Sequence, residues 1–128
     1  MLKHMLCGAM LLSLASPALA TNWVYVATGD RNVEVSLDKD SIGPGAGEYA
    51  GMTAAWFKQD HSKDNTTPVR TSKRLYVFDC AGKQMMWHSF IDYAPNGNMM
   101  NDGDGTKSMA PVAPDTVGAA MFQSVCGT

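Results

Sequence analysis

Two cysteines carry the most distinctive chemistry in this sequence. Of its three cysteines, Cys80 and Cys126 lie far from the apolar N-terminal stretch that contains Cys7. A lone cysteine pair in an exported protein is expected to form a disulfide, because extracytoplasmic compartments are oxidising. We therefore predict a bond between Cys80 and Cys126 that ties the C-terminus to the middle of the chain. Such a bond would leave no thiol for nucleophilic catalysis.

His88 lies within a methionine-rich segment that offers a second kind of chemistry. Met86 precedes this histidine by two residues, and Met99 and Met100 follow it. Thioether and imidazole groups form the soft ligand set that an exported protein would use for Cu(I). Methionine is also an ordinary filler of irregular cores. We therefore expect no bound metal or other cofactor, and copper binding through these four residues is the alternative hypothesis.

Catalytic motifs are missing from the sequence. It contains no Gly-x-Ser-x-Gly, His-Glu-x-x-His or phosphate-loop pattern. Asp38 and Asp40 form a close carboxylate pair, but a solvated turn explains them. Residues 101–106 resemble a calcium loop, yet Lys107 and Ala113 stand where an EF-hand needs Gly and Glu. We predict that the protein is not an enzyme. Its formal net charge of −2 gives no reason to expect nucleic acid as a partner.

The first 20 residues have the features of a secretory signal peptide. Lys3 provides a basic start, residues 5–14 are almost wholly apolar, and Ala18-Leu19-Ala20 matches a signal-peptidase site. The apolar stretch is too short to span a bilayer. We predict a cleaved signal peptide over residues 1–20 and a single mature domain over residues 21–128. The mature domain would then be periplasmic, secreted or on the cell surface, with no transmembrane segment.

Alternation of apolar residues predicts the elements that position these groups. β-branched and aromatic runs bounded by turn residues favour five strands, at residues 22–28, 33–37, 50–59, 71–80 and 84–93. Residues 94–107 have turn chemistry without apolar rhythm and are interpreted as a loop. After Pro114, Val117, Met121 and Val125 recur every four residues, which indicates a helix with one apolar face. The predicted fold is α+β, mainly β: an antiparallel sheet of about five or six strands with a C-terminal helix packed on it and fastened by the disulfide.

One short helix can cover only one face of such a sheet. The other face would carry aromatic groups toward solvent, and such groups often anchor protein interfaces. The candidates for partner contact are five aromatic residues: Trp23, Tyr25, Trp56, Tyr76 and Trp87. We expect most of these rings to be core and one or two to be exposed. Lys58 and Lys73 would add a basic rim that attracts acidic partners.

Short motifs along the mature chain, taken together, carry a family resemblance. In order they are Trp23-Val24, Asp40-Ser41-Ile42, Ser72-Lys73, Phe78-Asp79-Cys80, Pro114-Asp115-Thr116 and Val125-Cys126. With the cysteine pair, they resemble the surface-adhesin protein E family of small exported bacterial proteins. The resemblance implies an antiparallel sheet with a C-terminal helix held by the disulfide. For the best-known member it also implies binding of host extracellular-matrix and serum proteins at the cell surface.

Two features depart from what the resemblance implies. Leu6 precedes Cys7 where a lipobox has a small residue, so a lipid anchor is not expected. The methionine-rich segment over residues 85–109 is not a feature associated with the family. The leading hypothesis is an exported, adhesin-like, non-enzymatic module that binds a host matrix, serum or envelope protein. The alternatives are a soluble periplasmic copper-binding protein and a small envelope structural or stress factor, and the oligomeric state is left open.

Overall fold

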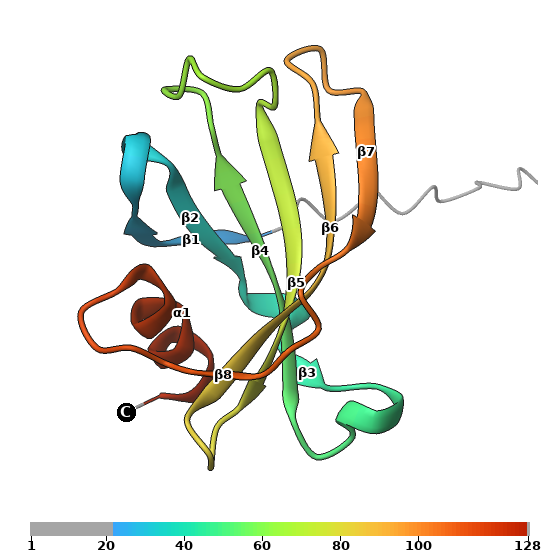
Figure 1. The fold of residues 1–128 in the computed structure, drawn as a ribbon, viewed down its shortest axis with the longest axis vertical. Helices are drawn as coiled ribbons and strands as arrows, with labels where there is room; N and C mark the ends of the chain where they lie inside the picture. Colours follow the sequence, from blue (N-terminus) through green and yellow to red (C-terminus); the bar gives the residue numbers. More distant parts are fainter. Residues whose placement is uncertain (1–21, 128) are drawn as a thin grey trace, which may run out of the picture.

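Six strands form one curved antiparallel sheet in the computed structural model, which describes residues 22–127 (Figure 1). Their order across the sheet follows the sequence: β1 (Trp23–Thr28), β2 (Glu34–Asp38), β4 (Thr53–Asp60), β5 (Thr71–Asp79), β6 (Gln84–Tyr93) and β7 (Met99–Asp104). Two short strands pair outside this order, β3 (Gly43–Pro44) with β4 and β8 (Ala110–Pro111) with β6. Three 3₁₀ turns lie at Asp30–Asn32, Lys39–Ser41 and Gly47–Tyr49. The predicted signal peptide lies outside the described residues.

All five predicted strands are confirmed, with small shifts at their ends. The interpretation of residues 94–107 as a loop is wrong for Met99–Asp104, which form β7 against β6. Every residue of β7 is exposed, so the strand buries neither of its faces. An edge strand that buries neither face needs no apolar alternation, because its pairing rests on backbone hydrogen bonds. The sequence signal for this strand is therefore absent even though the strand is present.

The C-terminal helix is confirmed as α1 (Val117–Cys126). The Thr116 hydroxyl caps its first turn by accepting a hydrogen bond from the backbone N–H of Ala119 at 3.1 Å. The helix ends at Gly127, whose φ of 75° is one that glycine adopts readily. No helix in the described part of the chain is long and apolar enough to cross a membrane.

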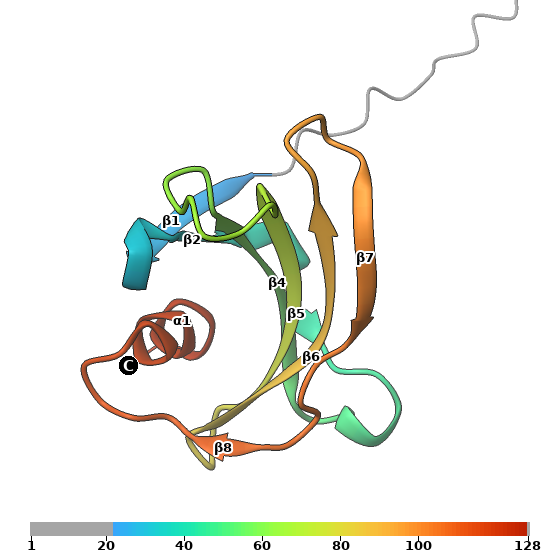
Figure 2. The same cartoon turned by 45° about the horizontal axis from the view of Figure 1, so that its top comes forward.

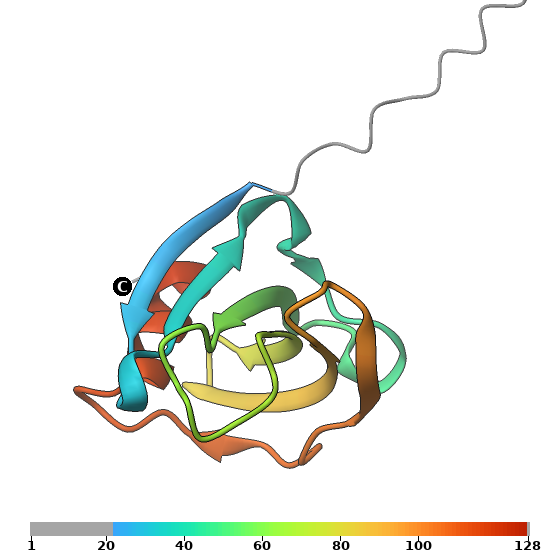
Figure 3. The same ribbon diagram turned by 90° about the horizontal axis from the view of Figure 1, so that it is seen from above.

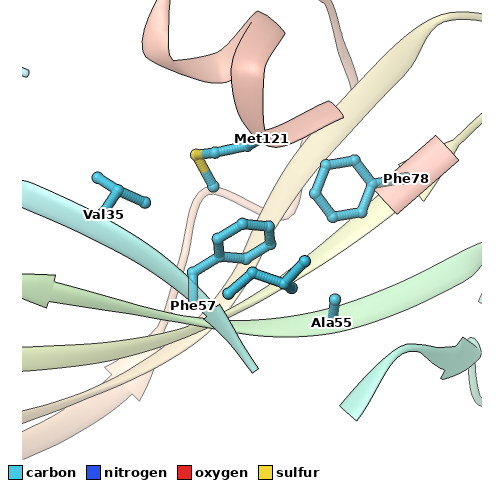
Figure 4. Packing of buried hydrophobic residues seen from close by; sticks show 6 residues of the cluster. Val35, Ala55, Phe57, Phe78 and Met121 are labelled. Atoms are coloured by element: carbon cyan, nitrogen blue, oxygen red, sulfur yellow. The ribbon is translucent and has the colours of Figure 1, made fainter. Parts of the chain in front are cut away.

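The main core lies between α1 and the concave face of the sheet. Figure 4 shows Met121 reaching from the helix toward Phe57 and Phe78, with Val35 and Ala55 nearby. Phe57, Phe78 and Ala55 have no exposed surface, and Met121 is 3% exposed. Full burial of an aromatic or long aliphatic side chain contributes roughly 1.5–3 kcal/mol. This cluster is therefore the main attachment of the helix to the sheet.

The predicted disulfide is present and strengthens that attachment. Cys80 follows β5 and Cys126 ends the helix, with their Cα atoms 5.5 Å apart. The two cysteines are separated by 46 residues, and closing a loop of that size lowers the entropy of the unfolded chain by the equivalent of about 4 kcal/mol. Both cysteines also pack against the core.

The sheet is strongly bent, and α1 covers only part of its concave face. Its register shifts at β-bulges in the β1–β2, β5–β6 and β6–β7 pairings, and bulges increase local bending and twist. Helix α1 packs against β1, β4 and β5 beside the lower part of the sheet in Figure 1. Figure 2 likewise places the helix away from the upper parts of β6 and β7. Seen from above, β1 and β7 lie on opposite sides of the molecule (Figure 3).

Candidate functional site

The five aromatic residues expected to contact a partner divide between the two faces of the sheet. Strand alternation from the buried Phe57 and Leu37 places Trp23, Tyr25 and Trp56 on the convex face. Tyr25 is 60% exposed, whereas Trp23 and Trp56 are half-buried. The structure therefore brings three of the five together on the face that the helix leaves uncovered.

Tyr76 and Trp87 instead face the concave side. These two residues are directly paired across β5 and β6. Tyr76 packs against the core, and its ring meets that of Phe57 edge-on at 5.6 Å. Trp87 lies beyond the core, next to Phe90 with ring centroids 5.5 Å apart. The two rings thus lie on the opposite face from the convex aromatic group.

A row of directly paired residues crosses the convex face. Tyr25 pairs with Ser36, Ser36 with Lys58, Lys58 with Lys73, and Lys73 with Ile91. Directly opposed residues in an antiparallel sheet point to the same side and lie about 5 Å apart at their Cβ atoms. The two lysines predicted as a basic rim are therefore neighbours at the centre of this row.

Each of these lysines lies over an aromatic ring. The Lys58 Nζ is 5.0 Å from the Trp23 ring centroid, and the Lys73 Nζ is 5.0 Å from that of Tyr93. Neither lysine makes an ion pair within residues 22–127. Opposed like charges are destabilising in a sheet, and a cation–π contact offsets about 0.5–1 kcal/mol at an exposed site. We call Trp23, Tyr25, Trp56, Lys58, Lys73 and Tyr93 the convex patch.

The methionine and histidine candidates are spread along the sheet. Met86 is buried near the start of β6, whereas Met99 pairs with Tyr93 at the end of that strand. Seven residues separate these positions on β6, or roughly 20 Å at about 3.3 Å per residue. His88 packs edge-on against Tyr49 at 5.6 Å. The structure therefore does not gather Met86 and His88 with the exposed Met99 and its neighbour Met100.

A chain of polar side chains lies on the concave face beyond the helix. The Ser72 hydroxyl donates a hydrogen bond to Asp92 Oδ1 at 2.6 Å, and its oxygen lies 3.3 Å from His61 Nε2. Asn101 Nδ2 donates to the second oxygen of Asp92 at 2.9 Å. Serine, rather than histidine, stands in the middle, and Ser72 is 2% exposed. A hydrolytic triad needs the histidine between an accessible serine and the carboxylate. These hydrogen-bonded side chains have a different order, so their arrangement does not activate Ser72 as a nucleophile.

Arg74 lies next to that polar chain. It is paired across the sheet with Phe57 on one side and Phe90 on the other. Its guanidinium carbon is 4.2 Å from the Trp87 ring centroid. Three buried nitrogens in this region, Arg74 Nε, Trp87 Nε1 and His61 Nδ1, have no hydrogen-bond partner among residues 22–127. We call His61, Ser72, Arg74, Trp87, Asp92 and Asn101 the concave cluster.

The concave cluster was not predicted from the sequence. There, Ser72 and Arg74 are only alternating polar residues at the start of a predicted strand. The one usable signal was that alternation. It marks a half-strand whose inward face is polar, but the partners come from the distant residues His61, Asp92 and Asn101. The residue pattern within one strand does not predict contacts with residues of other elements.

Two surface pockets flank the helix. One of about 360 Å³ lies between β1 and α1 and is lined by Val24, Leu37, Lys39 and Ala120, among others. A more polar one of about 640 Å³ lies between the β1–β2 turn and the helix start. Neither pocket includes a residue of the concave cluster, and of the convex patch only Tyr25 reaches the first.

Comparison with known families decides the relationship of the chain. The sequence profile of the family described as Surface-adhesin protein E matches residues 23–127. The chain belongs to that family. Among curated proteins, none matches the chain significantly.

Two solved structures of Haemophilus influenzae protein E have folds similar to that of this chain. Crystal form II of that protein has a TM-score of 0.54 at 16% identity, covering 80% of this chain and 86% of the other. The second structure has a TM-score of 0.56 at 13% identity, covering 84% and 86%. At such low identities, the likeness establishes the fold alone.

The motifs that mark membership in the surface-adhesin protein E family have structural roles here. Ser41 accepts a hydrogen bond from the backbone N–H of Trp56 at 2.8 Å and donates to the carbonyl of Asp38 at 2.6 Å, which fastens the β2–β3 connection to β4. Asp79 accepts from the N–H of Gly82 at 2.9 Å and closes the β5–β6 turn. Thr116 caps the helix. Ser41, Asp79 and Thr116 therefore maintain the fold, whereas Trp23 and Lys73 of the same set of motifs lie in the convex patch.

Proposed function

We propose that the protein is an exported, non-enzymatic adhesin that binds a host matrix or serum protein through its convex patch. Membership in the surface-adhesin protein E family supports the adhesin assignment. The observation that carries the surface is the pair of opposed lysines, Lys58 and Lys73, which make no ion pair within the described chain, although Lys58 helps to lower the pKa of nearby Asp60. This arrangement does not favour stability, so we assign it to recognition.

The chemistry of the convex patch suits an acidic protein surface. Lys58 and Lys73 attract a negatively charged partner over several ångströms, which accelerates encounter and aligns the two surfaces. Tyr25 and Trp23 then provide large, rigid contact groups of the type enriched in binding hot spots. The register of β1, β2, β4 and β5 holds Tyr25, Lys58 and Lys73 in one row, and the Lys58 ammonium group lies over the Trp23 ring beside that row. A rigid sheet loses little conformational entropy on binding.

Export belongs to this proposal, because an adhesin acts outside the cytoplasm. We expect cleavage between Ala20 and Thr21, without lipid on Cys7. The intact mass of the exported protein tests both points, since a diacylglyceryl adduct would add a large, defined mass. Protease shaving of intact cells then separates a surface location from a periplasmic one, and a fully protected protein would contradict adhesion.

Charge-removing variants test the convex patch directly. The double variant Lys58→Gln/Lys73→Gln is compared with Lys83→Gln, which removes a charge from the exposed β5–β6 turn. Binding to a panel of immobilised host matrix and serum proteins is measured by surface plasmon resonance at two salt concentrations. We expect the double variant to bind at least tenfold more weakly, with a reduced salt dependence and an unchanged or raised Tm. Unaltered binding in the double variant would rule out the convex patch as the interface.

A further inference from the structure

Arg74 is a half-buried cation that has no anionic partner in the described part of the chain. It stands between Phe57 and Phe90 in the register of the sheet and stacks on Trp87 at 4.2 Å. Within residues 22–127 it makes no ion pair, and its Nε has no hydrogen-bond acceptor. A partly desolvated guanidinium is costly to leave unpaired, and the aromatic contact offsets only part of that cost. The surroundings of Arg74 are therefore suited to binding an anion.

The acid nearest to Arg74 along β6 is already engaged. Both oxygens of Asp92 accept hydrogen bonds, one from Ser72 and one from Asn101. Because Ser72 gives its only hydroxyl proton to Asp92, His61 Nε2 must be the donor in its contact with Ser72. His61 Nδ1 is then an unprotonated nitrogen without a partner. Asp92 therefore accepts hydrogen bonds from Ser72 and Asn101, and makes no ion pair with Arg74.

His61 lies close enough to Arg74 for the guanidinium charge to affect its pKa. Burial, and secondarily the charge of Arg74, lower the pKa of His61, against the opposing influence of Asp64, Asp92 and Asp60. Both influences therefore favour the neutral imidazole over the protonated form. An added negative charge beside Arg74 would reverse part of this effect and favour the protonated imidazole, whose Nδ1–H could donate to it.

We propose that the concave cluster is a carboxylate-binding site in which Arg74 pairs with an acidic side chain of the protein partner and Trp87 forms the aromatic wall beside it. Arginine suits this role because its planar guanidinium can donate two parallel hydrogen bonds to a carboxylate while it stacks on a ring. Helix α1 lies beside the other half of the concave face, so it does not take this place. The proposal rests on the proposed function for the kind of partner, but it concerns a different face from the convex patch.

The indole N–H of Trp87 provides a specific probe. The three tryptophans give separate indole signals in an ¹H–¹⁵N NMR spectrum, and Trp23 and Trp56 lie on the convex face. The mature protein is titrated with a blocked peptide that carries one glutamate, with its glutamine counterpart and with inorganic phosphate. We expect a saturable shift of the Trp87 signal with the glutamate peptide, in the millimolar range, and little shift with the glutamine peptide.

Two variants and a matched control assign the effect to Arg74. Arg74→Gln should abolish the saturable shift, and Arg74→Lys, which keeps the charge but loses the planar fork, should weaken binding about tenfold. Lys83→Gln removes a charge from the exposed β5–β6 turn, outside both the convex patch and the concave cluster, and should leave peptide binding unaltered. Circular dichroism and the remaining NMR signals establish that each variant is folded.

A second measurement depends on proton linkage. Binding of the glutamate peptide should raise the pKa of His61, seen in its ring-proton shifts, and should therefore tighten as the pH falls. The same titration on Arg74→Lys should give a smaller rise. A Trp87 signal that does not move, or that moves equally with the glutamine peptide or only with phosphate, would overturn the proposal. That result would leave the proposed function intact if the convex variants still lose binding of the full-length partner.

Discussion

The two halves of the concave face are made by the same strands but have opposite chemistry. In the half beside α1, β4 and β5 contribute Phe57 and Phe78, which pack against Met121. Farther along the same strands, the inward positions are polar, with Ser72 and Arg74 on β5. The covered half supplies stability through burial, whereas the open half keeps polar groups available for a ligand. The length of the helix, and not the strand pattern alone, sets the boundary between them.

The largest expected effect comes from removing the disulfide that joins the helix to the covered half of the sheet. Replacing both bridged cysteines, in Cys80→Ala/Cys126→Ala, should lower the free energy of unfolding by about 4 kcal/mol, because the unfolded chain regains loop entropy. At roughly 5 °C per kcal/mol for a domain of this size, Tm should fall by about 20 °C. Thermal melts followed by circular dichroism measure this. Thiol labelling of the denatured, unreduced wild type should find neither cysteine free. An unchanged Tm would show that core packing alone holds the helix.

Met121→Ala should have the next largest effect. Its side chain is buried against the sheet, and truncating such a residue leaves a cavity that costs about 3 kcal/mol. Gln123→Ala lies on the exposed side of the same helix and is the matched control, with an effect within about 0.5 kcal/mol. Urea unfolding gives both values. Equal losses in the two variants would mean that the helix is not attached through Met121.

Ser72→Ala tests the open half and should destabilise the protein less. Removing the buried Ser72 hydroxyl leaves one oxygen of the half-buried Asp92 without its donor, which costs about 2 kcal/mol. Ser108→Ala, at an exposed site, serves as the control. Urea unfolding at pH 7 measures the difference. A loss as large as that of Met121→Ala would mean that the polar half contributes to stability as much as the apolar half.

The smallest effect concerns pH. The pKa of His61 is lowered in the folded state, so the unfolded chain binds a proton more readily below the usual value of about 6.5. Wild-type stability should therefore decline as the pH falls through that value. His61→Gln should lose this component of the decline, while His88→Gln should retain it. The measurement is the urea midpoint between pH 8 and pH 5, and parallel curves for wild type and His61→Gln would contradict the assignment.

Much of the fold followed from local patterns, and the exceptions are instructive. Alternation located the five longer buried strands, and the four-residue repeat of Val117, Met121 and Val125 located the helix. Strand β7 escaped because an edge strand exposed on both faces has no apolar rhythm. Of the predicted binding residues, Tyr25, Lys58 and Lys73 do lie in one row. Tyr76 lies on the other face, because alternation relative to the core decides direction and residue type does not.

The sequence by itself determined the disulfide pairing, the family and the order of elements, because two cysteines, short motifs and apolar periodicity are local or unique features. Only the tertiary structure decided which side chains meet. His61, Ser72, Asp92 and Asn101 come from β5, β6, β7 and the connection after β4, and the register of antiparallel pairing brings them together. That register depends on β-bulges that shift facing residues by one position. The unpaired charge of Arg74 is likewise visible only once its neighbours across the sheet are known.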